Sequence, residues 1–550
     1  MSIPQNSAII SLMKPIILII LDGWGINPEI QGNAIAQSNT PTIKKLDQFY
    51  PSISLQASGI AVGLPWGEMG NSEVGHLNLG SGRVIYQNLP KITLAIRDKT
   101  FFKNKAFLEA IEHTRKNNSA LHIMGLLSNG GVHSHIDHLE ALLKLAKRES
   151  VKKLFIHPFT DGRDTSPTEG VKFIAALEKE MNELKIGKIS TICGRYYAMD
   201  RKKNWDRTKK AYDSLTIGVG IKKENAIKAI KDSYEKDITD EFIEPTIIKS
   251  KVKSQKSKVN IGSESNTEQT IGLVNDNDAV VFFNFREDRA RQLTKAFVLR
   301  DFKGFERKKV VKNLCFVSMT EYEKNLPTIV AFPTEKINWP IARVISENGL
   351  QQLHIAETEK YAHITYFFNG GREKPFKGED RILIPSPQVA TYDQKPEMSA
   401  PEITRRLLSE IKTNKYDFIV VNFANLDMVG HTGNLKAAIQ AAEVIDGCLK
   451  QIIEATLNQG GGLIITADHG NAEEMINLKT GEILTEHTTN LVPFWLVIPQ
   501  NRKPEDENKT EYSKTLPRGI LADVAPTILE LMKLKKPAEM TGKSLMPLLK

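Results

Sequence analysis

The sequence predicts an α/β protein whose sheets are mainly parallel. Short apolar runs alternate along the chain with longer segments of helical periodicity. This alternation is typical of βαβ units. Three of the predicted strands end in acidic residues, and ligands of open α/β sheets bind beyond the carboxyl ends of the strands. At 550 residues, the chain is long enough for two or three domains.

The individual elements follow from the apolar runs and from helix start signals. Strands are predicted at 15–21, 121–127, 153–159, 187–193, 279–285, 312–318, 381–384, 417–424, 462–467 and 494–498. Helices are predicted at 40–50, 101–117, 136–148, 169–185, 287–299, 399–412, 434–458 and 521–533. Thr40 before Pro41, and Ser399 shortly before Pro401, are start signals for two of these helices.

The composition indicates a globular enzyme, with 41% hydrophobic and 25% charged residues. Cys193, Cys315 and Cys448 are far apart, which favours a reducing compartment and no disulfide framework. The longest apolar run, 15–21, is too short to span a membrane and lacks a signal-peptide cleavage site. We therefore expect a cytoplasmic protein without a membrane partner.

The net charge of +9 leaves a nucleic-acid-binding protein open as an alternative. Much of the excess comes from one lysine cluster, consisting of Lys249, Lys251, Lys253, Lys256 and Lys258. Lysine runs are usually solvated faces, and no nucleic-acid recognition motif accompanies this one. We expect no nucleic-acid partner and interpret the polar stretches 249–277 and 501–515 as exposed connections.

Residues 67–76, GEMGNSEVGH, place Ser72 at a predicted helix start. Gly70 allows a sharp turn before it. A hydroxyl at a helix start faces unpaired N–H groups and the positive end of the helix dipole, and both favour an alkoxide or a phosphate there. The alternative is that Ser72 only caps the helix, which is the commonest role of a serine in this position.

Acidic residues follow three predicted strands of the chain. Asp22, Asp427 and Asp468 come directly after, or within three residues of, the runs 15–21, 417–424 and 462–467. A single aspartate at a strand end is usually a cap or a turn residue. Three of them, delivered at the same edge of a parallel sheet, could converge on one pocket.

Histidines accompany these aspartates. His431 lies four residues after Asp427, His469 is adjacent to Asp468, and His487 precedes the strand 494–498. Three carboxylates, three imidazoles and Ser72 are enough ligands for two cations. Mixed carboxylate and imidazole ligands suit Mn²⁺, Zn²⁺ or Mg²⁺. A metal pair can clamp both oxygens in phosphoryl transfer and lower the pKa of a bound hydroxyl.

Four motifs resemble those of cofactor-independent (2,3-bisphosphoglycerate-independent) phosphoglycerate mutase, a member of the alkaline phosphatase superfamily. They are 21–25 (LDGWG), 70–76 (GNSEVGH), 425–433 (NLDMVGHTG) and 466–471 (TADHGN), in the order of the family and spread over nearly the whole chain. The resemblance implies an isomerase of glycolysis and gluconeogenesis that interconverts 3-phosphoglycerate and 2-phosphoglycerate.

The resemblance also implies the metal ligands. One ion would be held by Asp427, His431 and His487, and the other by Asp22, Ser72, Asp468 and His469. Ser72 would carry the phosphoryl group as phosphoserine. The implied cofactors are two divalent ions, Mn²⁺ first, with Mg²⁺, Co²⁺ and Zn²⁺ as alternatives.

Arginines also fall at or just beyond strand ends, in 161–167 (DGRDTSP), 194–201 (GRYYAMDR) and 284–289 (NFREDR). The planar guanidinium binds phosphate and carboxylate in bidentate fashion, so these loops favour an anion pocket over isolated surface salt bridges. A fourth loop, 130–138 (GGVHSHIDH), could be a histidine metal site or simply a strand-to-helix connection.

The family resemblance assigns the substrate contacts. They are His133, Arg163, Asp164, Arg195, Arg201, Arg286, Arg289 and Lys360. Asp164 would be the general base and acid for the glycerate hydroxyls. Lys360, which by itself would be interpreted as a surface residue, would contact the substrate from the other half of the chain.

These assignments divide the chain into two α/β domains. Residues 1–86 and 335–550 would form an alkaline-phosphatase-like metal-binding domain, with a transferase domain inserted at 87–334. Two neighbouring joins could act as a hinge. We expect a monomer acting on a small-molecule substrate. A phosphatase or sulfatase of the same superfamily, or a phosphopentomutase, would share the metal ligands, but the arginine loops argue against the first two and the residues His133, Arg163 and Asp164 against the third.

Overall fold

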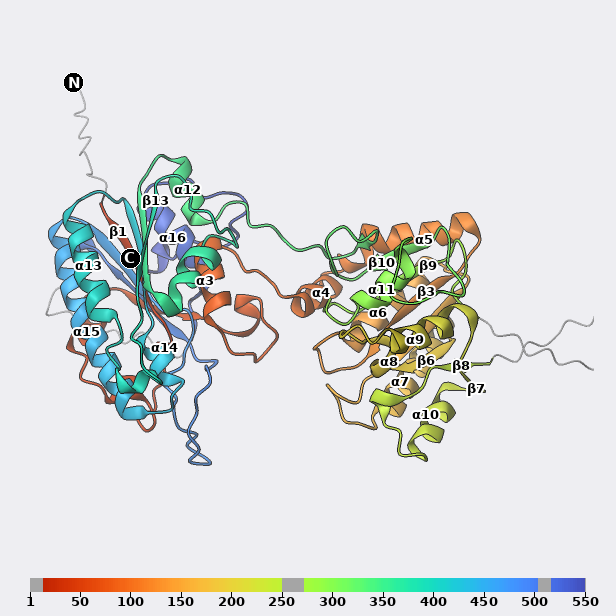
Figure 1. Ribbon diagram of the computed structural model, residues 1–550. Helices are drawn as coiled ribbons and strands as arrows, with labels where there is room; N and C mark the ends of the chain where they lie inside the picture. Colours follow the sequence, from red (N-terminus) through yellow and green to blue (C-terminus); the bar gives the residue numbers. More distant parts are fainter. Residues whose placement is uncertain (1–12, 250–271, 503–515, 550) are drawn as a thin grey trace, which may run out of the picture. The chain divides into compact units, whose positions relative to one another are not determined.

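The computed structural model describes residues 13–249, 272–502 and 516–549. The chain divides into two compact units, shown in Figure 1. Unit 1 consists of the segment up to Gln87 together with the segment from Glu335, and unit 2 spans Asn88–Thr334. Most of the predicted connection 249–277, with four of the five clustered lysines, lies outside the described residues, as does 503–515.

Unit 1 contains an eight-stranded sheet in the order β13-β12-β14-β1-β15-β16-β2-β17. Its strands are β1 (Ile16–Leu21), β2 (Ser52–Gln56), β12 (Gln352–Glu357), β13 (Glu379–Ile384), β14 (Phe418–Phe423), β15 (Gly462–Thr466), β16 (Val492–Val497) and β17 (Gly519–Ile520). β1 is parallel to both of its neighbours, β14 and β15. Its sequence IILIIL is completely buried, as expected for a central strand covered on both faces.

Helices cover both faces of this sheet. They are α1 (Ala34–Gln37), α2 (Pro41–Phe49), α3 (Ser72–Ser81), α12 (Ile341–Glu347), α13 (Ala400–Lys412), α14 (Asn425–Gly430), α15 (Leu435–Asn458) and α16 (Val524–Leu531). Figure 1 shows α13 and α15 on one side of the sheet and α3, α12 and α16 on the other. The buried residues of α15, among them Ala438, Ala442, Ile445 and Leu449, recur at helical spacing and form its core face.

Unit 2 contains a second sheet, in the order β11-β10-β9-β3-β4-β6-β8-β7, with β5 paired to β4. Its strands are β3 (Leu121–Leu127), β4 (Leu154–Thr160), β5 (Lys188–Ile189), β6 (Thr191–Gly194), β7 (Ile221–Lys223), β8 (Thr246–Ile248), β9 (Ala279–Phe282), β10 (Cys315–Ser318) and β11 (Ile329–Val330). Among these pairs only β6 and β8 are antiparallel.

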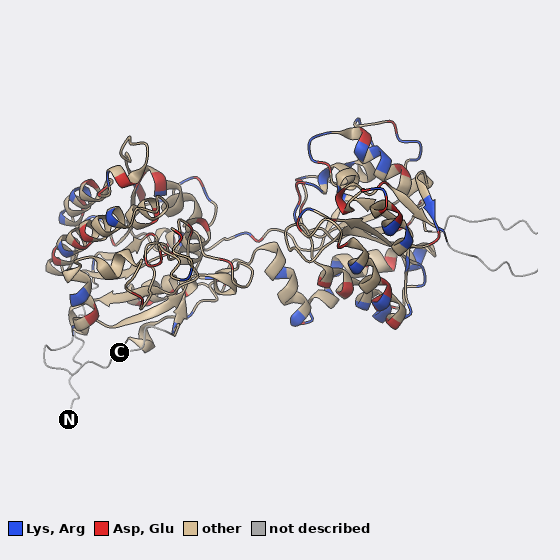
Figure 2. Ribbon diagram, turned by 90° about the horizontal axis from the view of Figure 1, so that it is seen from below, with Lys and Arg blue, Asp and Glu red and all other residues tan. Residues whose placement is uncertain are grey.

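The helices of unit 2 complete its two hydrophobic clusters. They are α4 (Asn88–Arg97), α5 (Lys105–Asn117), α6 (Ile136–Arg148), α7 (Gly170–Leu184), α8 (Arg195–Ala198), α9 (Trp205–Ile217), α10 (Ala226–Tyr234) and α11 (Arg291–Val298). In the view of Figure 2, Lys and Arg are interspersed with Asp and Glu over the helices of each unit. No helix in the described part of the chain is long and apolar enough to cross a membrane.

The predicted α/β class is confirmed, and the structure corrects several element boundaries. The strand predicted at 187–193 is two short strands, β5 and β6. The strand predicted at 312–318 begins only at Cys315, because Asn313 takes a left-handed backbone conformation with φ of 50°. The helix predicted at 521–533 starts as a 3₁₀ turn, and its α-helical part is α16.

Candidate metal centre and anion pocket

Three acidic residues meet at one edge of the sheet in unit 1. Asp22 directly follows β1, Asp468 lies just after β15, and Asp427 lies in α14 just after β14. The three strands are parallel neighbours, so their carboxyl ends share that edge. Gly23 permits the close approach: it has φ of 77°, and a Cβ there would lie 2.7 Å from the backbone nitrogen of Asp427. All three aspartates are buried.

The first group of ligand atoms consists of Asp427 Oδ1, His431 Nε2 and His487 Nε2. The two imidazole nitrogens lie 3.2 and 3.0 Å from the carboxylate oxygen and 3.1 Å from each other. The Nδ1 atoms lie 2.6 Å from the carbonyl oxygen of Thr485, for His431, and 2.8 Å from that of Gly70, for His487.

These contacts decide which ring nitrogens carry hydrogen. A carbonyl oxygen only accepts, so both Nδ1 atoms are donors, and in the neutral rings both Nε2 atoms present lone pairs. Two lone pairs and a carboxylate oxygen therefore face one point. This donor set fits a divalent cation, with the backbone carbonyls fixing the orientation of the rings.

The second group lies beside the first and includes Ser72. Ser72 Oγ is 3.2 Å from Asp22 Oδ1 and 3.0 Å from His469 Nε2. His469 Nε2 is also 3.5 Å from Asp468 Oδ2. The rings of His469 and His487 are stacked, with centroids 3.9 Å apart, so the two groups are adjacent. All seven predicted metal ligands lie in these two groups.

Charge compensates for the burial of this cluster. Burial alone would lower the pKa of His469, but Asp468, Asp427 and Asp22 raise it to about 9. Burial alone would raise the pKa of Asp22, but the ammonium of Lys360 and the His469 ring hold it well below its ordinary value. Asp22 is thus held in the ionised form that binds metal.

The helix cap is not Ser72. The residue that caps α3 is Asn71, whose side chain accepts a hydrogen bond from the N–H of Val74 at 3.0 Å. Ser72 is the first residue inside the helix, and its hydroxyl faces the ligand groups instead. The capping alternative for Ser72 is therefore wrong.

Lys360 lies within this centre in unit 1. Its Nζ donates to Asp22 Oδ1 at 2.7 Å, to Asp427 Oδ2 at 2.6 Å and to Ser72 Oγ at 2.7 Å. The residue is only 3% exposed, so the interpretation as a surface lysine is wrong. Burial opposes its charge, but the surrounding carboxylates raise the pKa of Lys360 well above its ordinary value.

In unit 2, the predicted substrate residues gather at the carboxyl ends of β4, β6 and β9. Arg195, at the end of β6, is 2% exposed. Its Nη1 lies 2.5 Å from Asp161 Oδ1 and 2.6 Å from Asp164 Oδ2. Asp161 also accepts hydrogen bonds from the backbone N–H groups of Arg163 and Asp164, so this one carboxylate orders the whole loop after β4.

A second carboxylate, Asp288, lies among three more of the predicted substrate residues. It lies 2.6 Å from Arg201, 3.4 Å from Arg286 and 3.6 Å from His133. Arg289 donates from Nη1 to the carbonyl oxygen of Met199 at 3.1 Å.

The guanidinium groups lie close enough together for the charges of three of them to lower the pKa of a fourth. Burial, and then the positive charges of Arg195, Arg201 and Arg163, lower the pKa of Arg289. Burial and Arg195 likewise lower the pKa of His133 to about 4, so His133 is neutral near pH 7. Several guanidinium groups held this close, two of which share the carboxylate of Asp288, fit a small substrate that carries two negative groups.

The histidine loop 130–138 is a strand-to-helix connection. His135 caps α6, its ring accepting from the N–H of Asp137 at 3.3 Å, and His138 faces Thr93 at 3.1 Å. The groups of metal-ligating residues found in the described ranges all lie in unit 1, so the metal alternative for this loop has no support there.

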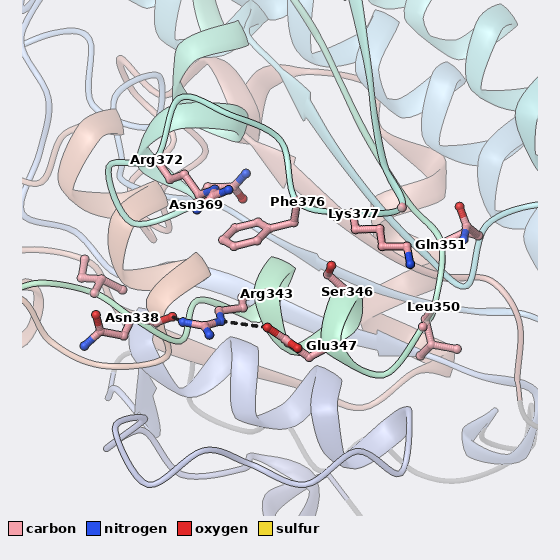
Figure 3. A pocket seen from close by; sticks show the side chains of 13 residues that line it. Asn338, Arg343, Ser346, Glu347, Leu350, Gln351, Asn369, Arg372, Phe376 and Lys377 are labelled. Atoms are coloured by element: carbon pink, nitrogen blue, oxygen red, sulfur yellow. Dashed lines mark hydrogen bonds and ion pairs between the residues drawn. The ribbon is translucent and has the colours of Figure 1, made fainter.

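A cavity of about 760 Å³ in unit 1 holds none of the predicted site residues. Figure 3 shows it between α12 and the loop around Phe376. Arg343 on its wall is engaged with Glu347 at 3.3 Å, and Arg372 stacks on the Phe376 ring at 4.6 Å. The size of a cavity therefore does not identify the reactive centre of this protein. The two groups of metal-ligating residues identify it.

Sequence reasoning did not single out four residues that shape the two sites. They are His76 and Asn422 in unit 1 and Asp161 and Asp288 in unit 2. A signal existed for Asn422, which is the single polar residue in the strand sequence FIVVNF. Asp161 and Asp288 stand inside the arginine loops and could have been recognised as the partners of those arginines.

The fold and the ligand groups define a metalloenzyme. The family model of the metalloenzyme superfamily matches residues 14–536, and with the clustered carboxylates and imidazoles this match indicates that the protein binds a divalent metal.

Relatives narrow this class to a family. The chain is 51% identical over 536 residues to the 2,3-bisphosphoglycerate-independent phosphoglycerate mutase of Moorella thermoacetica, covering 98% of this chain and 99% of that protein. It is 50% identical over 533 residues to the mutase of the same name from Clostridium botulinum, covering 97% and 99%. The chain belongs to the family of 2,3-bisphosphoglycerate-independent phosphoglycerate mutases.

A solved structure of Leishmania mexicana phosphoglycerate mutase, determined at low cobalt concentration, is also similar. It is 28% identical to this chain, covers 96% of it over 97% of its own length, and has a TM-score of 0.48.

Proposed function

We propose that this protein interconverts 3-phosphoglycerate and 2-phosphoglycerate by way of a phosphoserine at Ser72. The main support for the proposal is the environment of the Ser72 hydroxyl. Ser72 Oγ lies within 3.2 Å of a carboxylate, an imidazole and an ammonium group, all buried. The ammonium of Lys360 stabilises an ionised oxygen, which is the form that attacks phosphorus, and the carboxylate and imidazole would be ligands for divalent ions.

Two divalent ions would complete this centre. Asp427, His431 and His487 would hold one, and Asp22, Ser72, Asp468 and His469 the other, with Mn²⁺ proposed first and Mg²⁺, Co²⁺ or Zn²⁺ as alternatives. The ions would supply positive charge that lowers the pKa of the serine hydroxyl and offsets charge on the transferring group.

The protein's own residues would perform the rest of the reaction. The arginines of unit 2 would hold the carboxylate and phosphate of the substrate. Ser72 Oγ, in its ionised form, would form a bond to phosphorus while the bond from phosphorus to the glycerate oxygen breaks. Asp164 would give a proton to that leaving oxygen and then remove one from the other hydroxyl.

The second half of the reaction reverses the first on a neighbouring oxygen. The deprotonated hydroxyl of the bound glycerate would attack the phosphoserine, and the Ser72 oxygen would leave in its ionised form, while Asp164 keeps the proton for the next cycle. Protons and phosphoryl group balance, so the net change is an isomerisation. Lys360, 2.7 Å from Ser72 Oγ, would stabilise negative charge on that oxygen at both stages.

The proposal gives each unit a role. Residues 1–86 and 335–550 would be the phosphatase-like metal-binding domain and 87–334 the inserted transferase domain. We further propose a monomer that works in the cytoplasm, in glycolysis and gluconeogenesis. The lack of cysteine pairing supports the location: Cys193, Cys315 and Cys448 are all free.

The test is the variant Ser72→Ala, assayed with 3-phosphoglycerate for both 2-phosphoglycerate and free phosphate. We expect isomer formation to fall by at least about 1000-fold, because the nucleophile is lost. Ser81→Ala is the matched control, since Ser81 is a buried serine of the same helix whose hydroxyl donates to the Arg83 carbonyl oxygen at 2.9 Å. Full mutase activity in Ser72→Ala would exclude the phosphoserine route.

The same assay separates the mutase from its nearest rival. A phosphatase with the same metal centre would release free phosphate from 3-phosphoglycerate in the unmodified enzyme. We expect the isomer as the main product, because the arginine set of unit 2 provides a place for the glycerate to remain bound.

A further inference from the structure

A closed chain of hydrogen bonds runs behind the nucleophile in unit 1. It passes from Ser72 to Asp22, then to Asn422, then to His76, and returns to Ser72. None of these four side chains is more than 6% exposed. We propose that His76 and Asn422 are positioning residues, which fix the direction in which Asp22 and Ser72 present their reactive oxygens.

Asn422 holds one side of this chain. It lies on β14 opposite Ile20 of β1. Its Nδ2 donates to Asp22 Oδ2 at 2.7 Å and lies 3.0 Å from His76 Nε2. Because a carboxylate only accepts, the amide nitrogen must be the atom that faces Asp22, and its two hydrogens serve the two partners.

His76 holds the other side, and its tautomer follows from its contacts. Its Nδ1 lies 2.8 Å from the carbonyl oxygen of Ser72 and 3.2 Å from Asp468 Oδ2. Both partners only accept, so Nδ1 carries the hydrogen. Nε2 then has a lone pair, which accepts the second hydrogen of the Asn422 amide.

The chain of hydrogen bonds leaves one carboxylate oxygen of Asp22 available for the reaction. Oδ2 is taken by Asn422, so Oδ1 is directed at Ser72 Oγ and at Lys360 Nζ, 3.2 and 2.7 Å away. The same chain of hydrogen bonds also holds the backbone of Ser72, because His76 donates to the Ser72 carbonyl oxygen. Rotation of Asp22 or of the serine would break buried hydrogen bonds, which is costly.

Loss of His76 or Asn422 should impair one step of the reaction. His76 and Asn422 belong to unit 1 and the arginine set belongs to unit 2, so loss of either residue should slow phosphoryl transfer and leave substrate binding intact. This kinetic expectation rests on the proposed role of Ser72. The tautomer of His76 does not, so the two can fail separately.

The main variant is Asn422→Asp, which replaces the donating amide by an acceptor of the same shape. The matched control is Asn369→Asp. Asn369 is also a buried amide, and its Nδ2 lies 3.0 Å from both carboxylate oxygens of Glu379, so both variants place a second carboxylate beside a buried one.

Nitrogen NMR of histidine-labelled protein reads the tautomer directly. We expect His76 to carry its hydrogen on Nδ1 in the unmodified enzyme and in Asn369→Asp. In Asn422→Asp we expect a hydrogen on Nε2 as well or instead, because that atom now faces a carboxylate. The His76 signal is assigned by its absence from His76→Gln.

Kinetics give the second measurement. We expect Asn422→Asp to lower kcat for 3-phosphoglycerate by about 30-fold or more with KM changed less than about threefold, and Asn369→Asp to retain kcat within about threefold. Glutamine can donate to the Ser72 carbonyl and accept from Asn422, so His76→Gln should keep at least about tenfold more activity than His76→Leu.

Two results would overturn the proposal. One is a His76 ring that carries its only hydrogen on Nε2 in the unmodified enzyme, a measurement that needs no variant to fold. The other is an equal loss of kcat in Asn422→Asp and Asn369→Asp, which would reduce the effect to general destabilisation. Loss of activity in Ser72→Ala would stand in either case.

Discussion

The Nε2 atoms of His431 and His487 lie 3.1 Å apart, although 56 residues separate them in the sequence. Each ring donates its other nitrogen to a backbone carbonyl, so two lone pairs are directed at each other and at Asp427. Neutral rings in this arrangement repel unless a cation lies between them. The pair is therefore the most direct structural sign of metal binding in this protein.

Replacing one of these rings should weaken metal binding. We expect His487→Asn to lower the affinity for added Mn²⁺ by at least about 100-fold, since a ligand is removed rather than a supporting residue. Calorimetric titration of metal-stripped protein measures this. His135→Asn is the control, because asparagine can also cap α6, and its Mn²⁺ affinity should equal that of the unmodified protein.

The anion pocket depends on the shape of a guanidinium. Arg195→Lys keeps the charge, but a lysine presents a point charge instead of a planar fork. Nη1 alone contacts Asp161 and Asp164, so the variant loses the other N–H groups of the guanidinium, which would bind an anion. We expect KM for 3-phosphoglycerate to rise by about 30-fold. The comparison is Arg405→Lys on the exposed face of α13, paired only with Glu402. A normal KM in Arg195→Lys would remove Arg195 from the substrate pocket.

Stability should depend on pH through Glu357, a buried residue at the end of β12. Burial raises its pKa from 4.5 to about 7. The folded state therefore binds this proton more tightly than the unfolded chain does. The resulting stabilisation is complete below pH 4.5 and is lost as the pH rises through about 7.

Glu357→Gln removes this dependence. Unfolding in urea at pH 5 and pH 8 should show that the unmodified protein loses about 3 kcal/mol more of its unfolding free energy than the variant does between these values. Glu347→Gln, at an exposed carboxylate, should behave as the unmodified protein. Equal pH dependence in all three proteins would show that Glu357 ionises normally.

The large cavity beside α12 should be irrelevant to the reaction. We expect Lys377→Ala and Arg372→Ala to leave kcat/KM within about twofold of the unmodified value, because neither side chain contacts a ligand group. Lys360→Ala, by contrast, removes the ammonium next to Ser72 and should lower kcat/KM by at least about 100-fold. The formation of 2-phosphoglycerate from 3-phosphoglycerate is measured for all three variants.

Much of the fold could be predicted because the central strands are apolar and continuous. β1, β3, β14 and β15 all lie within predicted runs. β12 was missed, since its sequence QLHIAE contains three polar or charged residues that the structure buries and satisfies with hydrogen bonds. The pattern of a strand cannot show which polar residues will find buried partners.

Some residues of the candidate site could likewise be predicted from the sequence, and others could not. Asp22, Asp427 and Asp468 stand out because each ends an apolar run, and parallel pairing brings them together. The partners of the arginines are harder to predict, because whether Asp161 and Asp288 hold Arg195 and Arg201 depends on the path of loops. His76 of α3 and Asn422 of β14 meet although 346 residues separate them in the sequence, and no local pattern contains such a contact.

The order of strands in unit 1 also constrains how the chain is made. β1 pairs on both sides with strands that begin at Phe418 and Gly462, while unit 2 is one continuous segment between them. During synthesis from the N-terminus, unit 2 can complete its own sheet while β1 still lacks both neighbours. An exposed strand of sequence IILIIL is prone to aggregate, so the ribosome-bound chain has to protect β1 until most of the protein has emerged.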